Sequence, residues 1–181
     1  MNIRPVRKEE YLFTEEFVHE VFKGTKFSDG TIEKALVREI REKSDYIPEL
    51  DIVAEENGVI IGHCILSKLP INGTLENDVL LLSPVSVADE RQKQGVGTAM
   101  LQRGIKLAAK MGFKGIVVEG DYKYYRRFGF KTSTEFGIRA SKNNLPPSEE
   151  YLMALELKEN GLADIAGEVD YSIYDSLTLK K

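Results

Sequence analysis

Gln92-Lys93-Gln94-Gly95-Val96-Gly97 follows an apolar run at residues 79–87 and opens a helical pattern that continues to residue 111. A strand therefore leads into a glycine-rich loop, and the loop leads into a helix N-terminus. The first N–H groups of a helix have no partner inside it, and the aligned peptide dipoles place partial positive charge there. Glycine at positions 95 and 97 also removes the Cβ atoms that would keep an anion from the backbone.

The charge of the same segment supports an anion site at this loop. Between residues 91 and 118 the chain has basic side chains and no Asp or Glu, although its formal net charge is −4. The basic residues are Arg91, Lys93, Arg103, Lys106, Lys110 and Lys114. Because phosphate groups are anionic, this local excess and the helix N-terminus together predict a pyrophosphate site.

Length and composition are those of an ordinary globular protein. The 181 residues, 42% hydrophobic and 30% charged, suffice for a core that folds unaided, so we expect a single domain over residues 1–181. The acidic balance argues against a nucleic-acid partner, whose phosphates require a broad basic surface. Cys64 is the single cysteine, which excludes an internal disulfide and a cysteine zinc site.

The chain also has no signal for a membrane. No stretch reaches the roughly 18 consecutive apolar residues of a membrane span. The first residues, Met1 to Pro5, lack the basic-then-apolar pattern of a signal peptide. We therefore expect a cytoplasmic protein with no membrane partner.

Apolar periodicity and turn residues predict the other elements. Strands are predicted at residues 2–6, 51–56, 59–69, 79–87, 115–119 and 151–157, and helices at residues 8–22, 32–40, 95–111 and 121–128. The first helix has Leu12, Phe13, Val18, Val21 and Phe22 near helical spacing.

The order of these elements predicts the fold class. The Asn57-Gly58 dipeptide favours a two-residue hairpin turn between two antiparallel strands. Residues 79–119 should form a right-handed parallel strand–helix–strand unit. The expected fold is therefore α+β, with a mixed, mostly antiparallel sheet flanked by helices.

Three interpretations of the glycine loop are open from these residues. The simplest is a tight turn without a ligand. A Rossmann dinucleotide site has partial support, because Glu119 ends the next strand where a ribose-binding acid would lie, but Met100 occupies the third glycine position. The third interpretation is an acyl-CoA pyrophosphate loop. A P-loop is excluded because no Gly-Lys-Ser/Thr sequence follows.

Two spaced motifs resemble the GNAT superfamily of acetyltransferases. Gln92-x-x-Gly95-x-Gly97, after a strand that ends at Val85-Ser86-Val87, is similar to the Q/R-x-x-G-x-G/A signature of that superfamily. Tyr125-Arg126-Arg127-Phe128-Gly129-Phe130 resembles its Y-x-x-x-G-F segment at the expected distance downstream. The resemblance covers nearly the whole chain and is weakest in residues 8–43 and after residue 132, where the superfamily builds its acceptor specificity.

This resemblance implies a GNAT-like twisted sheet, with an acyl-CoA-binding core at about residues 50–131 and C-terminal strands and a tail at residues 132–181. It implies an N-acetyltransferase that uses acetyl-CoA as cosubstrate and needs no metal. The acetyl group would pass directly, in a ternary complex, to an amine of an unidentified small molecule or peptide. Residues 124–130 resemble a bacterial branch whose acceptors are mostly unassigned. A homodimer is left open.

The resemblance also assigns residues to acetyl-CoA. It gives the backbone N–H groups of Val87 and Val85 to the pantetheine arm and the thioester carbonyl, which requires this strand to separate from its parallel neighbour. Pro84 predicts a bulge there, since proline cannot donate to a ladder. The resemblance assigns the pyrophosphate to the loop and the helix start, which consist of Gln92, Lys93, Gln94, Gly95, Val96, Gly97 and Thr98.

The resemblance assigns one catalytic residue, and the position of a strand end suggests a second. Tyr125 matches the tyrosine that protonates the departing thiolate, with the adjacent Tyr124 as an open alternative, since neighbouring helical side chains point about 100° apart. Glu119 is the candidate general base, and Glu56 and Asp121 are alternatives. A water relay, or an amine that enters neutral, would remove the need for any of them.

Two other classes of function stay open. A non-catalytic acyl-CoA sensor or partner-binding module would keep the cleft and lose turnover. A less favoured NAD(P)-binding oxidoreductase would use the glycine loop for a dinucleotide. Tyr125 and the glycine loop favour catalysis, whereas the lack of an evident base favours the sensor.

Overall fold

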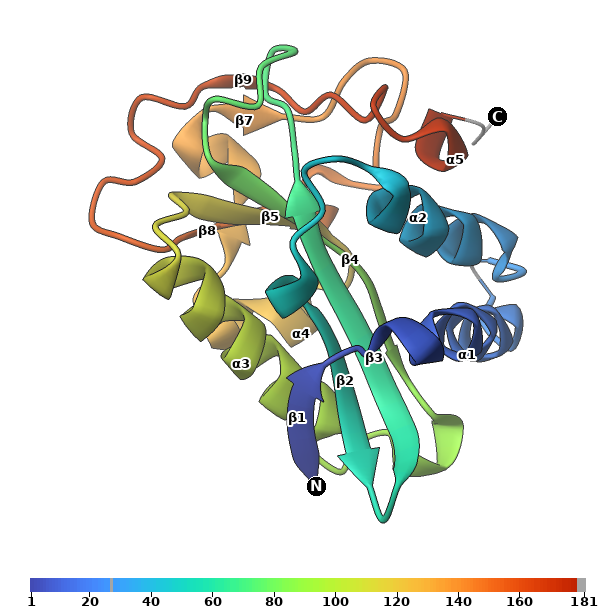
Figure 1. The fold of residues 1–181 in the computed structure, drawn as a ribbon. Coiled ribbons are helices and arrows are strands. Elements are labelled where there is room, and N and C mark those ends of the chain that lie inside the picture. Colours follow the sequence, from blue (N-terminus) through green and yellow to red (C-terminus); the bar gives the residue numbers. More distant parts are fainter. Residues whose placement is uncertain (27, 179–181) are drawn as a thin grey trace.

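A mixed β-sheet forms the centre of the molecule in the computed structural model, which describes residues 1–26 and 28–178 (Figure 1). Over those residues the sheet has seven strands in the order β1-β2-β3-β4-β5-β8-β6, and β7 and β9 form a second, two-stranded sheet. In the large sheet β4 and β5 run parallel, and the other paired neighbours are antiparallel. The expected α+β fold with its parallel unit is confirmed.

The elements have the following bounds. The strands are β1 (Asn2–Pro5), β2 (Asp51–Glu56), β3 (Val59–Lys68), β4 (Val79–Val87), β5 (Gly115–Glu119), β6 (Lys131–Thr132), β7 (Ile138–Arg139), β8 (Leu152–Glu156) and β9 (Gly167–Glu168). The helices are α1 (Tyr11–Lys23), α2 (Thr31–Glu42), α3 (Val96–Lys110), α4 (Tyr122–Tyr125) and α5 (Asp175–Thr178). A 3₁₀ turn at Arg126–Phe128 directly follows α4.

The predicted hairpin and helix end follow from local turn chemistry. Asn57 (φ 52°) and Gly58 (φ 79°) both adopt left-handed backbone between β2 and β3, as a type I′ turn requires. Gly129 (φ 92°) ends the turn after α4 in a left-handed backbone conformation, which costs glycine little free energy. Both predictions are confirmed.

Two hydrophobic layers cover opposite faces of the sheet (Figure 1). On one face α1, α2 and the C-terminal segment surround Val18 and Ile65. On the other face α3 and α4 surround Leu66 and Met100. The adjacent residues Ile65 and Leu66 belong to different layers because successive side chains of a strand point to opposite faces.

Strands β4 and β5 separate after a short parallel pairing. In the part of the chain that the structure describes, residues 79–81 pair with residues 115–117, and no further pairs between these strands follow. The register between β3 and β4 also shifts, between the pairs Cys64–Val85 and Leu66–Leu82. Pro84 lies inside this shift, so the predicted bulge is confirmed. Beyond residue 81, one edge of β4 has no neighbouring strand among the described residues.

Helix α1 buries a different stripe from the apolar one that the sequence suggested. Its buried residues are Thr14, Glu15 and Val18, whereas Leu12 and Phe13 are 74% and 55% exposed. Side chains two positions apart on a helix point about 200° apart, so burying Thr14 turns Leu12 outward. The stripe is set by polar contacts of Thr14 and Glu15 with α2.

The chain after residue 132 contributes more to the core than its irregular pattern indicated. Strands β7 and β9 have 2 residues each, too few for a periodicity to appear. Val169, Tyr171 and Tyr174 are nevertheless buried in the layer that contains α1 and α2. The division into a core at about residues 50–131 and a C-terminal part at residues 132–181 stays a prediction.

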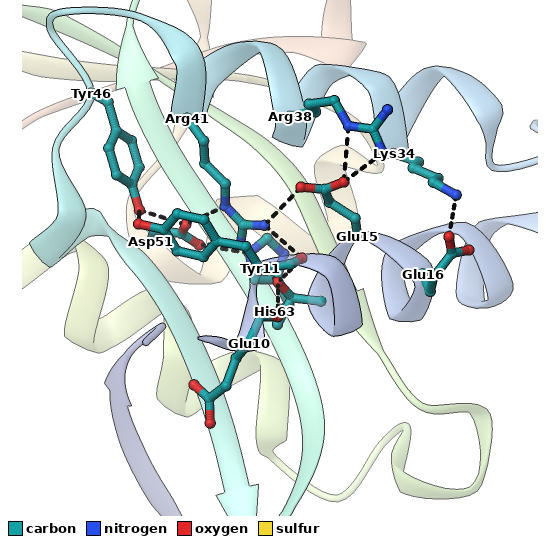
Figure 2. A network of polar contacts seen from close by, with 11 residues as sticks. Glu10, Tyr11, Glu15, Glu16, Lys34, Arg38, Arg41, Tyr46, Asp51 and His63 are labelled. Atoms are coloured by element: carbon teal, nitrogen blue, oxygen red, sulfur yellow. Dashed lines mark hydrogen bonds and ion pairs between the residues drawn. The ribbon is translucent and has the colours of Figure 1, made fainter. Parts of the chain in front are cut away.

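A buried polar network fixes α1 and α2 to the sheet (Figure 2). Arg41 of α2 donates through Nε to Asp51 Oδ2 (2.8 Å) and through Nη2 to Thr14 Oγ1 of α1 (2.8 Å). Asp51 also accepts from the Tyr46 hydroxyl (2.8 Å), and its Oδ1 lies 2.7 Å from His63 Nε2 of β3. Asp51 and His63 are completely buried.

The partners of Asp51 determine its charge. Burial alone would raise the pKa of this carboxyl, but hydrogen bonds and charge interactions with His63 and Arg41 outweigh burial and lower the pKa to about 2. Asp51 is therefore an anion at neutral pH. The network sets where α1 lies on the sheet, and with it where the C-terminal end of α1 lies.

Candidate active site

A cavity of about 920 Å³ opens where β4 and β5 separate. Residues of both hydrophobic layers line it, so the cavity passes from one face of the sheet to the other. The α1–α2 side of the cavity consists of Val21, Phe22, Thr25, Glu33, Leu81, Tyr171 and Leu177. The α3–α4 side includes Val85, Val87, Val96, Gly97, Tyr124, Tyr125 and Arg127.

The free edge of β4 presents backbone donors to this cavity. Ala88 N donates to Ile61 O of β3 (3.0 Å), so the N–H of Ala88 points toward β3. Because successive N–H groups of a strand point to opposite edges, those of Val87 and Val85 point away from β3. Both residues line the cavity. The separated strands therefore leave two N–H groups for a ligand, as the sequence resemblance requires.

The glycine loop forms one end of the cavity. Lys93 (φ 60°) and Gly95 (φ 87°) have left-handed backbone, and no described atom lies within 4 Å of a Cβ built on Gly95. Helix α3 starts at Val96. The first helical hydrogen bond among the described residues runs from the N–H of Ala99 to Gly95 O (3.0 Å). The N–H groups of the preceding turn thus have no i−4 partner, which is the arrangement that binds anions at helix N-termini.

Gly97 has a role that its sequence position did not reveal. A Cβ atom at this position would lie 2.5 Å from the Tyr124 hydroxyl and 3.6 Å from Tyr124 Cζ. Real Cβ atoms do not approach other atoms that closely, so Gly97 allows Tyr124 to pack against the first turn of α3. Glycine here serves contact with Tyr124, in addition to the anion approach that the sequence suggested.

The polar side chains of the loop differ in direction. Gln92 donates to Asp89 Oδ1 (2.8 Å) and to Val87 O (3.3 Å), so it ties the loop to the end of β4. Gln94 donates to Glu90 O (2.7 Å) and is the one predicted cosubstrate residue absent from the described cavity lining. The other predicted residues, Lys93, Gly95, Val96, Gly97 and Thr98, all line the cavity.

The two arginines of the second motif also differ. Arg127 lines the cavity, donates to Thr98 Oγ1 (3.0 Å) and lies over the Tyr124 ring, 4.3 Å from its centroid. Arg126 instead pairs with Glu150 at 2.9 Å on the surface. Arg127 therefore adds a fixed positive charge beside the helix N-terminus.

Tyr124 and Tyr125 both line the cavity but face different parts of it. Their rings are perpendicular, with centroids 5.0 Å apart. The Tyr124 hydroxyl lies against Gly97 at the loop, whereas Tyr125 packs on Gly120 and on the Phe130 ring at 5.8 Å. Burial raises the pKa of Tyr125, and neighbours that include Tyr124 raise it further. Tyr125 is therefore a neutral phenol at physiological pH and can donate a proton.

Two of the three candidate carboxylates reach the cavity. Glu119, at the end of β5, and Asp121, the N-cap of α4, both line it. Asp121 already accepts from Lys123 N (2.9 Å). Glu56 pairs with Arg91 at 2.7 Å and is not among the described lining residues. Glu119 and Asp121 therefore stay candidates for the general base, and Glu56 does not reach the cavity.

Sequence reasoning assigned no individual residue on the α1–α2 side of the cavity. Glu33 lies in the first turn of α2, and Tyr171 and Leu177 lie in the irregular C-terminal segment. The resemblance is weakest in these two regions, and their residues have no motif. The one usable signal was the apolar and aromatic content of residues 169–177. Periodicity does not indicate which distant strand such residues contact.

Metal and membrane features are absent from the part of the chain that the structure describes. In residues 1–26 and 28–178 no group of three or more His, Cys, Asp and Glu side chains could hold a metal ion. No helix formed by these residues is long and apolar enough to cross a membrane.

Similar solved structures share this fold. The crystal structure of the GNAT family N-acetyltransferase YhbS from Escherichia coli in complex with CoA superposes with a TM-score of 0.81 and 24% identity, over 94% of this chain and 88% of YhbS. A GNAT family acetyltransferase from Brucella melitensis, in complex with acetyl-CoA, has a TM-score of 0.76 and 27% identity, over 96% of this chain and 97% of that chain.

Sequence comparison leads to the same family. The uncharacterized N-acetyltransferase YjhQ of Escherichia coli (strain K12) is 30% identical over 100 residues, which are 55% of this chain and 55% of YjhQ. YhbS of the same strain is 26% identical over 144 residues, 79% of this chain and 83% of YhbS. The model of the acetyltransferase (GNAT) family matches residues 15–130, more than half of the 181 residues. The chain therefore belongs to the GNAT family of acetyltransferases.

Proposed function

We propose that this protein transfers the acetyl group of acetyl-CoA directly to an amine, with both substrates bound at once. The observation that carries the proposal is the cavity that crosses the sheet at the separation of β4 and β5. Two substrates can enter such a cavity from opposite faces and meet between the strands. That arrangement supports direct transfer, because it needs no covalent enzyme intermediate.

The α3–α4 side takes acetyl-CoA in this proposal. The pyrophosphate binds the N–H groups at the start of α3, beside Lys93 and Arg127, and the pantetheine arm follows β4. Val85 and Val87 donate their N–H groups to the arm and to the thioester carbonyl. The structural relatives were solved in complex with CoA and with acetyl-CoA, which supports acetyl-CoA as the cosubstrate.

The chemistry requires few groups. The nitrogen of the neutral amine attacks the thioester carbon, the C–N bond forms, and the C–S bond breaks with its electron pair going to sulfur. A backbone N–H at β4 stabilises the oxyanion, and Tyr125 gives its proton to the thiolate. The proton that the amine loses passes to Glu119 or to solvent. Tyr125 fits this role better than Tyr124, whose hydroxyl lies at the loop end.

The alternative functions have less support. A Rossmann loop needs glycine at the position of Met100, where it allows the helix to pack closely on the strand. Met100 is completely buried in the α3 layer, so this requirement of the dinucleotide interpretation is not met. A non-catalytic acyl-CoA sensor would use the same cavity. Tyr125, a neutral phenol lining that cavity, favours catalysis over the sensor.

Ligand binding and turnover test the proposal separately. CoA and acetyl-CoA should raise the melting temperature and NAD should not, because only a ligand of the native state stabilises it. With acetyl-CoA and a broad amine panel, free CoA should be released faster than in the absence of an acceptor. Stabilisation by acetyl-CoA without acceptor-dependent CoA release would support the sensor, and stabilisation by NAD alone would contradict both.

Replacing Gly97 with valine should weaken acetyl-CoA binding at least about tenfold, or about 1.4 kcal/mol. The valine side chain would obstruct the approach of the pyrophosphate to the first turn of α3 and would displace the Tyr124 hydroxyl. Calorimetric titration with acetyl-CoA measures the affinity, and circular dichroism verifies that the variant is folded.

A second pair of variants separates these two causes. In Tyr124→Phe the atom nearest to a Cβ at position 97 becomes a ring carbon at 3.6 Å, an ordinary contact. The double variant Gly97→Ala with Tyr124→Phe should therefore fold normally and still bind acetyl-CoA weakly. Full affinity in the double variant would show that Gly97 acts only through Tyr124, and would contradict the pyrophosphate position.

A further inference from the structure

The basic side chains that line the cavity lie toward one end of it. Among the described lining residues, Lys93 and Arg127 belong to the α3–α4 side or its loop, and Arg91 is paired with Glu56. Asp121 is an acidic residue of the same side. On the α1–α2 side no described lining residue is Lys, Arg or His, and Glu33 provides a carboxylate. Glu33 accepts a hydrogen bond from the Ser28 hydroxyl, a neutral group that brings no positive charge to it. This end of the cavity favours a cation.

An unsatisfied hydroxyl lies on the same side. Tyr171 lines the cavity and is 7% exposed, and its hydroxyl oxygen has no hydrogen-bond partner among the described residues. Burial raises the pKa of Tyr171, and the charge of Glu119, which lines the same cavity, raises it further. Buried hydroxyls are normally paired, because leaving one unpaired costs free energy. A ligand with an N–H group would remove that cost.

Tyr174, three residues further along, shows the contrast. It is equally part of the buried layer, but its hydroxyl is hydrogen-bonded to Lys68 O and to Ser67 Oγ, each at 2.8 Å. Tyr174 is not among the described residues that line the cavity. The Tyr174 hydroxyl thus has hydrogen-bond partners within the protein, whereas the Tyr171 hydroxyl has none among the described residues.

Apart from Thr25, the remaining walls of the α1–α2 side are apolar. They consist of Val21 and Phe22 of α1, Leu81 of β4 and Leu177 of α5. Such walls bind an aliphatic or aromatic group and exclude water from it. They offer no cation that could pair with a carboxylate of the ligand, since none of these residues carries a charge.

We infer that the acceptor is a primary amine on an apolar body without an α-carboxylate, bound as its ammonium form by the Tyr171 hydroxyl and the negative charge of Glu33. This inference rests on the proposed function, because it takes the α1–α2 side as the acceptor site. The Tyr171 oxygen accepts a hydrogen bond from the ammonium group. The ammonium then gives up one proton to solvent and becomes the neutral nucleophile that attacks the thioester carbon.

Matched pairs of small molecules test the inference. Each pair joins an amine to the amino acid that differs from it only by an α-carboxylate: 3-methylbutylamine and leucine, 2-phenylethylamine and phenylalanine, cadaverine and lysine. Binding to the protein saturated with CoA is measured by calorimetry, so that no turnover is required. We expect at least one amine to bind at least about tenfold more tightly than its amino acid.

Three variants identify the residues responsible. Tyr171→Phe keeps the ring and should weaken binding of the best amine about three- to tenfold, the usual contribution of one hydrogen bond. It should not lower the melting temperature, because the hydroxyl has no internal partner among the described residues. The control Tyr174→Phe should lower the melting temperature and leave amine binding unchanged. Glu33→Gln should reduce the ratio of the affinity for the amine to the affinity for its amino acid.

The outcomes separate this inference from the proposed function. Amine binding with the expected preference but without CoA release would support the inference and contradict the transferase. CoA release that is as fast with the amino acids as with the amines would support the transferase and overturn the inference. It is also overturned if no amine binds the CoA complex, or if Tyr171→Phe and Tyr174→Phe affect amine binding equally.

Discussion

Tyr125→Phe should lower kcat about 10²-fold and leave acetyl-CoA affinity unchanged. The substitution retains the ring that packs on Gly120 and Phe130 and removes only the hydroxyl, so the free energy of unfolding should change little. The lost proton donation belongs to the transition state, where it lowers kcat without affecting ground-state binding. Steady-state release of CoA, with the acceptor found in the amine panel, measures kcat. Calorimetric titration measures the affinity for acetyl-CoA.

Tyr124→Phe is the matched control, since the same atom is removed from the adjacent residue. The Tyr124 hydroxyl lies at the loop beside Gly97, so its loss should leave kcat within a few-fold of the unmodified protein. A large fall of kcat in Tyr124→Phe, with Tyr125→Phe unaffected, would reverse the assignment. A small fall in both would mean that the thiolate departs without a proton from either tyrosine.

Asp51→Asn should lower the free energy of unfolding by about 3–5 kcal/mol at pH 7, the usual result of removing one partner of a buried ion pair. The change leaves Arg41 facing a neutral amide between α1, α2 and β2. It also weakens the contact to His63, which is completely buried. Urea unfolding followed by circular dichroism measures the loss. The matched control is Asp164→Asn at an exposed position, which should change stability by less than about 0.5 kcal/mol.

The pH dependence of this difference follows from the pKa of Asp51. Its folded-state value of about 2 lies below its ordinary value of 3.8, so the charged form stabilises the fold. That stabilisation, on the order of 2 kcal/mol, is complete above about pH 4 and is lost as the pH falls through about 2. The difference between Asp51→Asn and the unmodified protein should therefore shrink over this range. An undiminished difference at low pH would show that packing, and not charge, causes the effect.

The polar network also links stability to the proposed site. Arg41 joins α1 to the sheet through Thr14 and Asp51, and the C-terminal end of α1 supplies Val21 and Phe22 to the cavity. If α1 were held less firmly, the α1–α2 side of the cavity would widen and its α3–α4 side would stay unchanged. Variants of the network should therefore weaken amine binding more than acetyl-CoA binding, and parallel titrations of the two ligands would reveal this.

Several features were determined by the sequence alone, because short-range physics encodes them. Asn57-Gly58 specifies the hairpin, since the turn needs two left-handed residues. The apolar run before the loop and the 3.6-residue periodicity after Gly95 specify a strand followed by a helix. Pro84 specifies a break in the ladder. The family could be inferred from the spacing of the two motifs, and the family match confirms it.

Other features were decided only by the tertiary structure. Tyr124 and Tyr125 are equivalent in a local pattern, and only the packing of Tyr124 on Gly97 directs them to different parts of the cavity. Leu12 turns to solvent because buried Thr14 must reach Arg41. Glu33 and Tyr171 meet at one cavity although most of the chain separates them. Periodicity and turn chemistry act over a few residues. The α1–α2 side of the cavity is built from contacts between distant segments, which form only when both layers pack on the sheet.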